Sequence, residues 1–238
     1  MATPAYKRVL LKFSGQQLAG QYEFGVDPEI ASFLAAEVKK VVDSGCQVVM
    51  IVGGGNMVRG AELAGQGIRR VTADQMGMLS GLINCMAMTD IFEANGVKTR
   101  CLSNIFAQQV AESYSYRLAE KHLQKGRVVI VAGGTARPYV THDTAAVSFA
   151  LELDCQLVLK ASKVEGVYDK DPAKFPDAVK LDKVTFQEAV ENNSIKVMDK
   201  AAMGLAMEQA KPIVVFDAMK PDNFTKIVAG QPVGTKIS

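Results

Sequence analysis

The sequence predicts an α/β protein, a three-layer αβα sandwich with a mostly parallel central sheet. Two observations predict this fold. Short runs of apolar and β-branched residues alternate with segments of helical periodicity, and this alternation is typical of parallel sheets built from strand–helix–strand units. The short runs are also apolar at successive positions rather than at every second one, as expected of strands covered on both faces.

Six of these short runs are predicted to be strands. In chain order they are Val9–Phe13, Gln47–Val52, Thr99–Ser103, Arg127–Val131, Leu157–Leu159 and Ile213–Phe216. Segments between them are predicted helices with a recognisable start or end. These helices are Pro28–Asp43, which ends before Gly45; Thr144–Leu153, capped by Asp143; a helix that starts with the capping box of Thr185 and Glu188; Lys200–Ala210, capped by Asp199; and a last helix between Pro221 and Gly230.

A further predicted helix, Asp74–Asn95, is apolar around most of its circumference and rich in methionine. Little of such a helix can face water. It is therefore either a central core helix or a helix buried partly by another subunit, and the sequence leaves both interpretations open.

Composition excludes several classes of protein. Of the 238 residues, 48% are hydrophobic and 22% are charged, which argues against disorder and a coiled coil. The net charge of +2 is too small to indicate a nucleic-acid partner. No apolar run approaches the roughly 18 residues of a membrane helix, and the first residues lack a signal-peptide core. We expect one domain, residues 1–238, in the cytoplasm, with no membrane partner.

The four cysteines, Cys46, Cys85, Cys101 and Cys155, are spread along the chain without a CxxC pair. Metal ligation needs clustered ligands, so no metal site is predicted, and the thiols are expected to be buried and reduced. His122 is expected at the surface without a functional role.

Four predicted strands end in residues suited to phosphate, at the place where ligands of open parallel sheets bind. These exits are Lys12-Phe13-Ser14-Gly15; Gly53-Gly54-Gly55-Asn56, followed by Arg59; residues 133–143; and Lys160, Ser162 and Lys163, followed by Gly166-Val167-Tyr168 and Asp171-Pro172. Glycine amides can surround an anion and lysines can neutralise it. Each exit alone is a weak signal, whereas four at one sheet edge predict a groove for a polyphosphate.

The standard nucleotide-binding loops do not occur in this sequence. There is no G-x-x-x-x-G-K-[ST] pattern, and the dinucleotide pattern fails because Val58 occupies its third glycine position. The predicted phosphate site therefore uses neither loop.

Six motifs in chain order resemble those of the bacterial UMP kinases, a group within the amino acid kinase family. They are Lys12-Phe13-Ser14-Gly15; Gly53-Gly54-Gly55-Asn56 with Arg59-Gly60; Asp74-x-Met76-Gly77-Met78-Leu79; Thr135 to Asp143; Lys160-x-x-Lys163-Val164-x-Gly166-Val167-Tyr168 with Asp171-Pro172; and Val197-Met198-Asp199. The resemblance covers essentially the whole chain, and the Asp74 and Asp199 motifs are the more specific to this group.

The resemblance implies transfer of the γ-phosphoryl group of ATP to UMP, with Mg2+ arriving on the nucleotide. It implies catalytic roles for Lys12, Arg59 and Asp143. It implies ATP contacts from Lys12, Phe13, Ser14, Gly15, Gly55, Arg59, Ser162, Lys163, Tyr168 and Asp171. It implies UMP contacts from Gly54, Asp74, Thr135, Ala136, Arg137, Pro138, Tyr139, Val140, Thr141 and His142. It also implies a homohexamer with GTP and UTP as effectors.

Four positions depart from the pattern of this group. Gln16 replaces a glutamate, and Arg137, Val140 and His142 replace an asparagine, an aromatic residue and a threonine beside the expected acceptor. Arg137 is expected to offer a bidentate phosphate contact. His142 is expected to offer a hydrogen bond from a ring that titrates near neutrality.

Two alternative functions remain open. A kinase with an amino acid or carboxylate acceptor would share Lys12 and the glycine-rich exits, but would not be expected to carry the Asp74 motif. A catalytically idle nucleotide sensor or storage protein on the same fold would be expected to have lost a charge-neutralising residue, whereas Lys12, Arg59 and Lys163 are all present.

Overall fold

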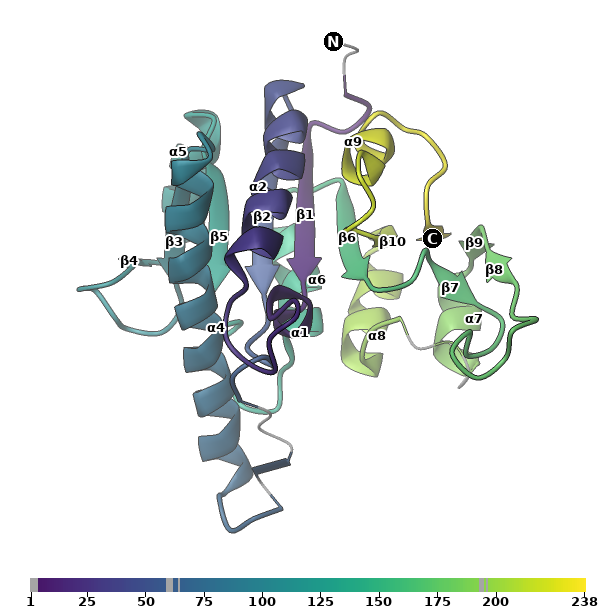
Figure 1. The fold of residues 1–238 in the computed structure, drawn as a ribbon, viewed down its shortest axis with the longest axis horizontal. Helices are drawn as coiled ribbons and strands as arrows, with labels where there is room; N and C mark the ends of the chain where they lie inside the picture. The colour runs from purple at the N-terminus through teal and green to yellow at the C-terminus, as the bar shows by residue number, and fades with distance from the viewer. Residues whose placement is uncertain (1–3, 59–61, 64, 193–194, 196) are drawn as a thin grey trace.

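The computed structural model describes residues 4–58, 62–63, 65–192, 195 and 197–238. Its centre is a nine-stranded sheet in the order β4-β3-β5-β2-β1-β6-β10-β11-β9 (Figure 1). The strands are β1 (Arg8–Phe13), β2 (Gln47–Val52), β3 (Thr99–Ser103), β4 (Glu112–Ser113), β5 (Val128–Ala132), β6 (Leu157–Ser162), β9 (Lys183–Val184), β10 (Ile213–Asp217) and β11 (Thr235–Ile237). In this sheet β10 and β11 are antiparallel, and the other described neighbours are parallel. The predicted mostly parallel sheet is confirmed.

Helices cover both faces of the sheet (Figure 1). On one face, α2 (Pro28–Asp43), α4 (Arg70–Ala94) and α9 (Asn223–Val228) pack over a shared apolar core. On the other face, α5 (Tyr116–Gln124), α6 (His142–Glu152), α7 (Phe186–Glu191) and α8 (Lys200–Glu208) pack over a second core. The strands supply both cores because successive side chains point to opposite faces: Leu11 lies in the first core and Leu10 in the second. The predicted αβα sandwich is therefore confirmed.

The six predicted strands all occur with small shifts at their ends. Five short strands were not predicted, namely β4, β9, β11 and an antiparallel pair outside the main sheet, β7 (Val167–Tyr168) with β8 (Lys180–Leu181). Each has only two or three residues, which is too few for a strand period to be recognised.

The start of α6 differs from its prediction. The helix begins at His142, and the hydroxyl of Thr141 is its N-cap, accepting hydrogen bonds from the amides of Asp143 and Thr144. The predicted cap by Asp143 is wrong because Asp143 lies inside the first turn. Its carboxylate accepts a hydrogen bond from Lys160 instead.

Two other helices also start elsewhere than predicted. The methionine-rich helix α4 begins at Arg70 rather than at Asp74, and α9 begins at Asn223 rather than at Pro221. Because α4 starts one turn earlier, Arg70 lies on the same helix face as Asp74, four residues later.

Other local predictions are confirmed. Thr185 and Glu188 form the capping box of α7, and the Asp199 carboxylate caps α8 by accepting from the Ala202 amide. Gly45 has a φ of 93° just after α2, a conformation that favours glycine.

The expectation for the cysteines is confirmed and that for His122 is wrong. All four cysteines are free and buried. His122 is only 5% exposed, and its ring nitrogens lie 3.2 Å from Glu112 and 2.9 Å from Arg127. Across the described part of the chain, no helix is long and apolar enough to cross a membrane, and no group of three or more His, Cys, Asp or Glu residues could hold a metal ion.

Candidate active site

The carboxyl ends of β5, β2, β1 and β6 are neighbours in the sheet, so the four predicted exits meet at one edge (Figure 1). A cluster of three charged side chains lies there. Lys12 Nζ on β1 is 2.7 Å from Asp143 Oδ1, and Lys160 Nζ on β6 donates to Asp143 Oδ2 at 2.9 Å. All three side chains are largely buried, with exposed fractions of 12%, 16% and 19% for Lys12, Asp143 and Lys160. Sequence reasoning gave catalytic roles to Lys12 and Asp143, and included Lys160 only among the residues of a strand exit suited to phosphate.

The charges of this cluster shift one another's ionisation. Burial acts to raise the pKa of Asp143, but the two lysines outweigh it and hold that pKa below its ordinary value. Burial lowers the pKa of Lys160, against the opposing effect of Asp143. One carboxylate between two ammonium groups leaves an excess of positive charge, which suits a polyphosphate ligand.

Close packing at the glycine-rich loop after β2 leaves no room for a side chain at two positions. One is Gly54 in the loop itself, and the other is Gly15, which follows β1. A Cβ atom on Gly54 would lie 2.7 Å from the Cβ of Ser80 and 2.8 Å from the amide nitrogen of Gly81, both on α4. A Cβ atom on Gly15 would lie 3.0 Å from the amide nitrogen of Gly55. Close backbone packing therefore requires glycine at 15 and 54, independently of any ligand.

A buried amide pair, which sequence reasoning missed, ties this loop to α4. Asn56 and Asn84 exchange hydrogen bonds of 2.9 and 2.7 Å, and Asn84 also donates to the Gly53 carbonyl at 2.8 Å. Both side chains are buried, so their mutual pairing removes the cost of unsatisfied amides. A polar Asn84 within the methionine-rich, mostly apolar middle of α4 was the available sequence signal.

A cavity of about 200 Å³ lies between the glycine-rich loop, the first turns of α4 and the segment before α6. Five of the predicted acceptor residues line it: Gly54, Asp74, Val140, Thr141 and His142. The other five predicted acceptor residues, 135–139, do not line this cavity. They form the loop that leads into it, with Arg137 exposed.

Asp74, on the wall of this cavity, is already hydrogen-bonded to protein groups. Arg70 Nε lies 2.8 Å from Oδ1, and the Tyr139 amide donates to Oδ2 at 2.8 Å. Burial favours a higher pKa for Asp74, but these two donors lower it below its ordinary value. The Arg70 guanidinium also lies 5.2 Å from the centre of the Tyr139 ring, a cation–π contact. Because Tyr139 has a φ of 66°, these contacts hold a strained backbone in place.

Two buried polar atoms of this segment, His142 Nε2 and Thr135 Oγ1, have neither a hydrogen-bond partner nor an ion-pair partner among the described residues. Burial, with a contribution from Lys12, lowers the pKa of His142 to about 4. The expectation that His142 titrates near neutrality is therefore wrong, and its ring is neutral at pH 7. Since unpaired buried polar atoms are costly, both atoms are suited to hydrogen-bond a ligand.

A larger cavity, of about 510 Å³, lies at the end of β6 beside β7 and the loop after it. Among the predicted ATP-binding residues, Ser162, Tyr168 and Asp171 line it, whereas Lys163 is exposed and does not. Lys160 lines it as well, so the charged cluster borders this cavity. His142, which precedes Asp143 in the sequence, lines the smaller cavity, so the cluster is close to that cavity without lining it.

The other predicted residues are placed as follows. The Phe13 side chain is fully buried in the first core, so only its backbone is accessible to a ligand. Ser14 is the N-cap residue of α1 (Gly15–Leu18) and makes no side-chain cap hydrogen bond. Arg59 lies outside the residues that the structure describes. Asp199 accepts hydrogen bonds from the hydroxyl of Thr144 at 3.0 and 3.1 Å, which joins α8 to α6.

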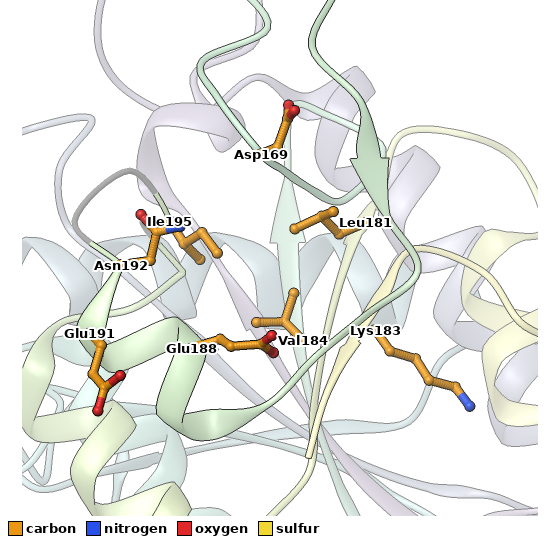
Figure 2. Close-up of a pocket in the computed structure, with 8 residues that line it drawn as sticks. All are labelled: Asp169, Leu181, Lys183, Val184, Glu188, Glu191, Asn192 and Ile195. Atoms are coloured by element: carbon orange, nitrogen blue, oxygen red, sulfur yellow. The ribbon is translucent and has the colours of Figure 1, made fainter.

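A third cavity, of about 440 Å³, shares no lining residue with the other two (Figure 2). Its lining combines Asp169, Glu188, Glu191 and Lys183 with the aliphatic Leu181 and Val184. In Figure 2 the Glu188 carboxylate lies beside Val184, whereas the carboxylates of Asp169 and Glu191 point away from it. None of its lining residues was predicted to be functional, and Glu188 is engaged in the capping box of α7.

Residues 7–217 match the amino acid kinase family, and the chain belongs to that family. Among solved structures, the UMP kinase of Bacillus anthracis is 35% identical, with a TM-score of 0.93 over 98% of this chain and 96% of that one. The UMP kinase of Ureaplasma parvum is 30% identical, with a TM-score of 0.90 over 98% of each chain. The uridylate kinase of Archaeoglobus fulgidus is 26% identical, with a TM-score of 0.75 over 97% of this chain and 99% of that one.

Proposed function

We propose that this protein is a UMP kinase, which transfers the γ-phosphoryl group of ATP to UMP and forms ADP and UDP for pyrimidine nucleotide synthesis. One observation carries the proposal. Lys160 of the charged cluster lines the larger cavity, and His142, the sequence neighbour of Asp143, lines the smaller one. The cluster is therefore close to both cavities, as a phosphoryl transfer between two nucleotides requires.

The transfer needs positioning and charge neutralisation more than covalent help. A phosphate oxygen of the acceptor forms the new bond to the γ-phosphorus as the bond to the β–γ bridging oxygen breaks, and ADP leaves with that electron pair. The attacking oxygen is already anionic, so no general base is required. This agrees with Asp143, whose two oxygens are both engaged by lysines. Lys12 would stabilise the transferring group, with Arg59 as a second cation.

The smaller cavity is the proposed UMP site. A carboxylate has about four lone-pair positions, so Asp74 can accept from ribose hydroxyls while it keeps one of its protein donors. Thr135 Oγ1 and His142 Nε2 are buried and unpaired in the described structure, and they would hydrogen-bond the nucleotide. Arg137, which is exposed, would reach the acceptor phosphate.

The larger cavity is the proposed ATP site. Ser162, Tyr168 and Asp171 would hold the adenosine end, and Lys163 would approach from the exposed rim. Backbone amides of Ser14, Gly15 and Gly55 would hold the phosphates. Mg2+ is expected to arrive with ATP, because phosphate oxygens supply most of its ligands in kinase sites.

The assembly is also a proposal. Leu79, Ile83 and Met86 on α4 are 48%, 51% and 36% exposed, and their spacing places them on one helix face. We propose that this face is buried by a second copy and that such dimers build a cytoplasmic homohexamer. Each subunit would be a single domain of residues 1–238, and GTP and UTP would regulate the assembly. Light scattering that gives a mass near 25.6 kDa would contradict the assembly.

A phosphoryl-transfer assay with Mg-ATP and a panel of acceptors tests the function. We expect turnover with UMP and none with aspartate or acetylglutamate, while dUMP and CMP define the tolerance of the acceptor site. Lys12→Ala should lower kcat by at least ~100-fold while UMP still binds in calorimetry. Turnover only with a carboxylate would replace the proposal by the alternative kinase, and UMP binding without any turnover would favour a nucleotide sensor.

A further inference from the structure

Thr235, close to the C-terminus, lies behind one wall of the larger cavity. It is the first residue of β11, and its register partner in β10 is Val215. Val215 lines the larger cavity, and so do Gly166 and Val167, where β7 begins. A Cβ atom on Gly166 would collide with the Thr235 hydroxyl and lie 3.2 Å from the Thr235 amide nitrogen. Thr235 therefore packs directly against this wall without lining the cavity itself.

The Thr235 hydroxyl links both strands of the β7–β8 hairpin to the main sheet. It accepts a hydrogen bond from the Val167 amide at 2.8 Å and donates one to the Leu181 carbonyl oxygen. The Val167 carbonyl oxygen, at 3.5 Å, is a more distant second acceptor. Val167 and Leu181 are register partners in the antiparallel pair of β7 and β8, so a single side chain is bonded to both strands at the same level.

Water cannot replace these hydrogen bonds in the folded protein. Thr235 is 0% exposed, and Val167 and Ile237 beside it belong to the second apolar core. Buried backbone groups that lose a partner are costly, so removal of the hydroxyl should shift the hairpin. Val215 would stay in place, because β10 lies between β6 and β11 in the main sheet. A shift of the hairpin alone would change the shape of the larger cavity.

We propose that Thr235 is a positioning residue for the nucleoside triphosphate: its hydroxyl fixes the β7–β8 hairpin, so that Gly166, Val167 and Tyr168 keep the cavity wall in the shape that holds the adenosine end. This role rests on the proposed kinase function, because it requires the larger cavity to be the ATP site. None of the sequence motifs includes Thr235.

The first test compares Thr235→Val, which keeps the shape of the side chain without its hydroxyl, with Thr235→Ser, which keeps the hydroxyl. Thr235→Val should raise the KM for ATP by ~10-fold, with kcat and the KM for UMP within about threefold of wild type. The effect should be selective because the two proposed nucleotide cavities share no described lining residue. Thr235→Ser should stay close to wild type. An unchanged KM for ATP in Thr235→Val, or an equal rise in both KM values, would overturn the proposal.

Thr225→Val is the matched control. The buried Thr225 hydroxyl, on α9, has no hydrogen-bond partner among the described residues, so its loss should leave both KM values unchanged. A rise in the KM for ATP as large as that of Thr235→Val would overturn the proposal. If Thr235→Val does not fold in a thermal unfolding scan, Thr235→Cys replaces it. The thiol is a weak donor and acceptor, so the KM for ATP should still rise, and a wild-type value would overturn the proposal.

A binding titration without turnover separates this role from the kinase function. In calorimetry, the Kd of adenylyl imidodiphosphate, a non-hydrolysable ATP analogue, should rise by ~10-fold in Thr235→Val, while the Kd of UMP stays unchanged. Equal analogue Kd values in wild type and Thr235→Val would overturn the role even in an active kinase. Wild-type protein that binds the analogue but phosphorylates no acceptor would contradict the kinase function alone, and the titration would still decide the role of Thr235. Wild-type protein that does not bind the analogue would contradict both.

Discussion

Asp143 and Asp74 are two shielded carboxylates on the two sides of the proposed acceptor site, with 16% and 15% of their side chains exposed. Burial favours the neutral form of each, and donors lower the pKa of each below its ordinary value. Their partners differ. Lysines on two central strands hold Asp143, whereas Asp74 is held by Arg70, which is 42% exposed, and by the amide of Tyr139 in a strained loop.

The difference indicates how rigid each side of the site is. The charges around Asp143 are fixed by the middle of the sheet, so they are in place before a substrate binds. An ion pair four residues apart on one helix with a partly exposed arginine, such as Arg70 and Asp74, contributes little to stability. We therefore expect changes near Asp143 to affect stability and kcat, and changes near Asp74 to affect KM for the acceptor.

The largest effect is expected for Asp143→Asn, because the change leaves two lysines facing an uncharged amide. It should lower the free energy of unfolding by about 3 kcal/mol and kcat by ~100-fold. Urea unfolding and initial rates at saturating substrates measure both. Asp74→Asn is the matched control and should cost less than about 1 kcal/mol of stability; equal losses from the two variants would refute the comparison.

Gly54→Ala tests whether the two sides are held at a fixed separation. The new methyl group would be pushed against Ser80 and the backbone of α4, and overpacking of this kind should destabilise the fold by about 2 kcal/mol. Gly77→Ala is the control. Gly77 lies on α4, and a Cβ atom there would meet no atom within 4 Å. In thermal unfolding, Gly77→Ala should match or exceed wild type; a stable Gly54→Ala would show that α4 can move away from the loop.

The pH dependence of stability isolates His142, which connects the two sides. Its pKa in the folded protein is about 4, against an ordinary value of 6.5. The unfolded chain therefore takes up the proton first, and stability should fall as the pH drops from 6.5 to 4, by roughly 2 kcal/mol. His142→Thr should lose less stability over this interval, as measured by urea unfolding at pH 6.5 and 4. Equal losses in the two proteins would contradict the neutral ring.

The smallest effect is expected for Arg70→Ala. Loss of its contacts with Asp74 and Tyr139 should loosen the acceptor loop and raise the KM for UMP by about 5- to 10-fold, with kcat nearly unchanged. Arg70→Lys keeps the charge but not the stacked, planar group. Its KM for UMP should therefore fall between those of wild type and Arg70→Ala. A lower kcat with an unchanged KM would place Arg70 with the Asp143 side of the site instead.

The fold was largely predictable because its strands and helices repeat one local pattern. The six long strands and the helix Pro28–Asp43 were recognised from apolar runs and periodicity. Strands of two residues were not, since their pairing is decided by neighbours far along the chain. The cap of α6 was assigned to Asp143 instead of Thr141 because both residue types cap helices well, and only the backbone shows which one precedes the first turn.

The candidate site divides in the same way. Lys12 and Asp143 were named from motifs, but the structure joined them to Lys160, which lies beside Lys12 only through the pairing of β1 with β6. Likewise, the pairing of Asn56 with Asn84 and the contact of Asp74 with Tyr139 link residues from different segments. His142 was expected to titrate near neutrality because its pKa depends on burial and on Lys12, which sequence spacing does not give.

The sequence by itself determined the alternation of strands and helices and the glycine- and lysine-rich strand ends, because these depend on residues close together in the chain. The tertiary structure alone decided which oxygen of Asp143 each lysine takes, which glycines admit no side chain, and which ring stays neutral. Those properties depend on burial and on distances between segments that can lie more than a hundred residues apart in the sequence, such as β1 and β6. They arise only when the parallel sheet brings these segments into register.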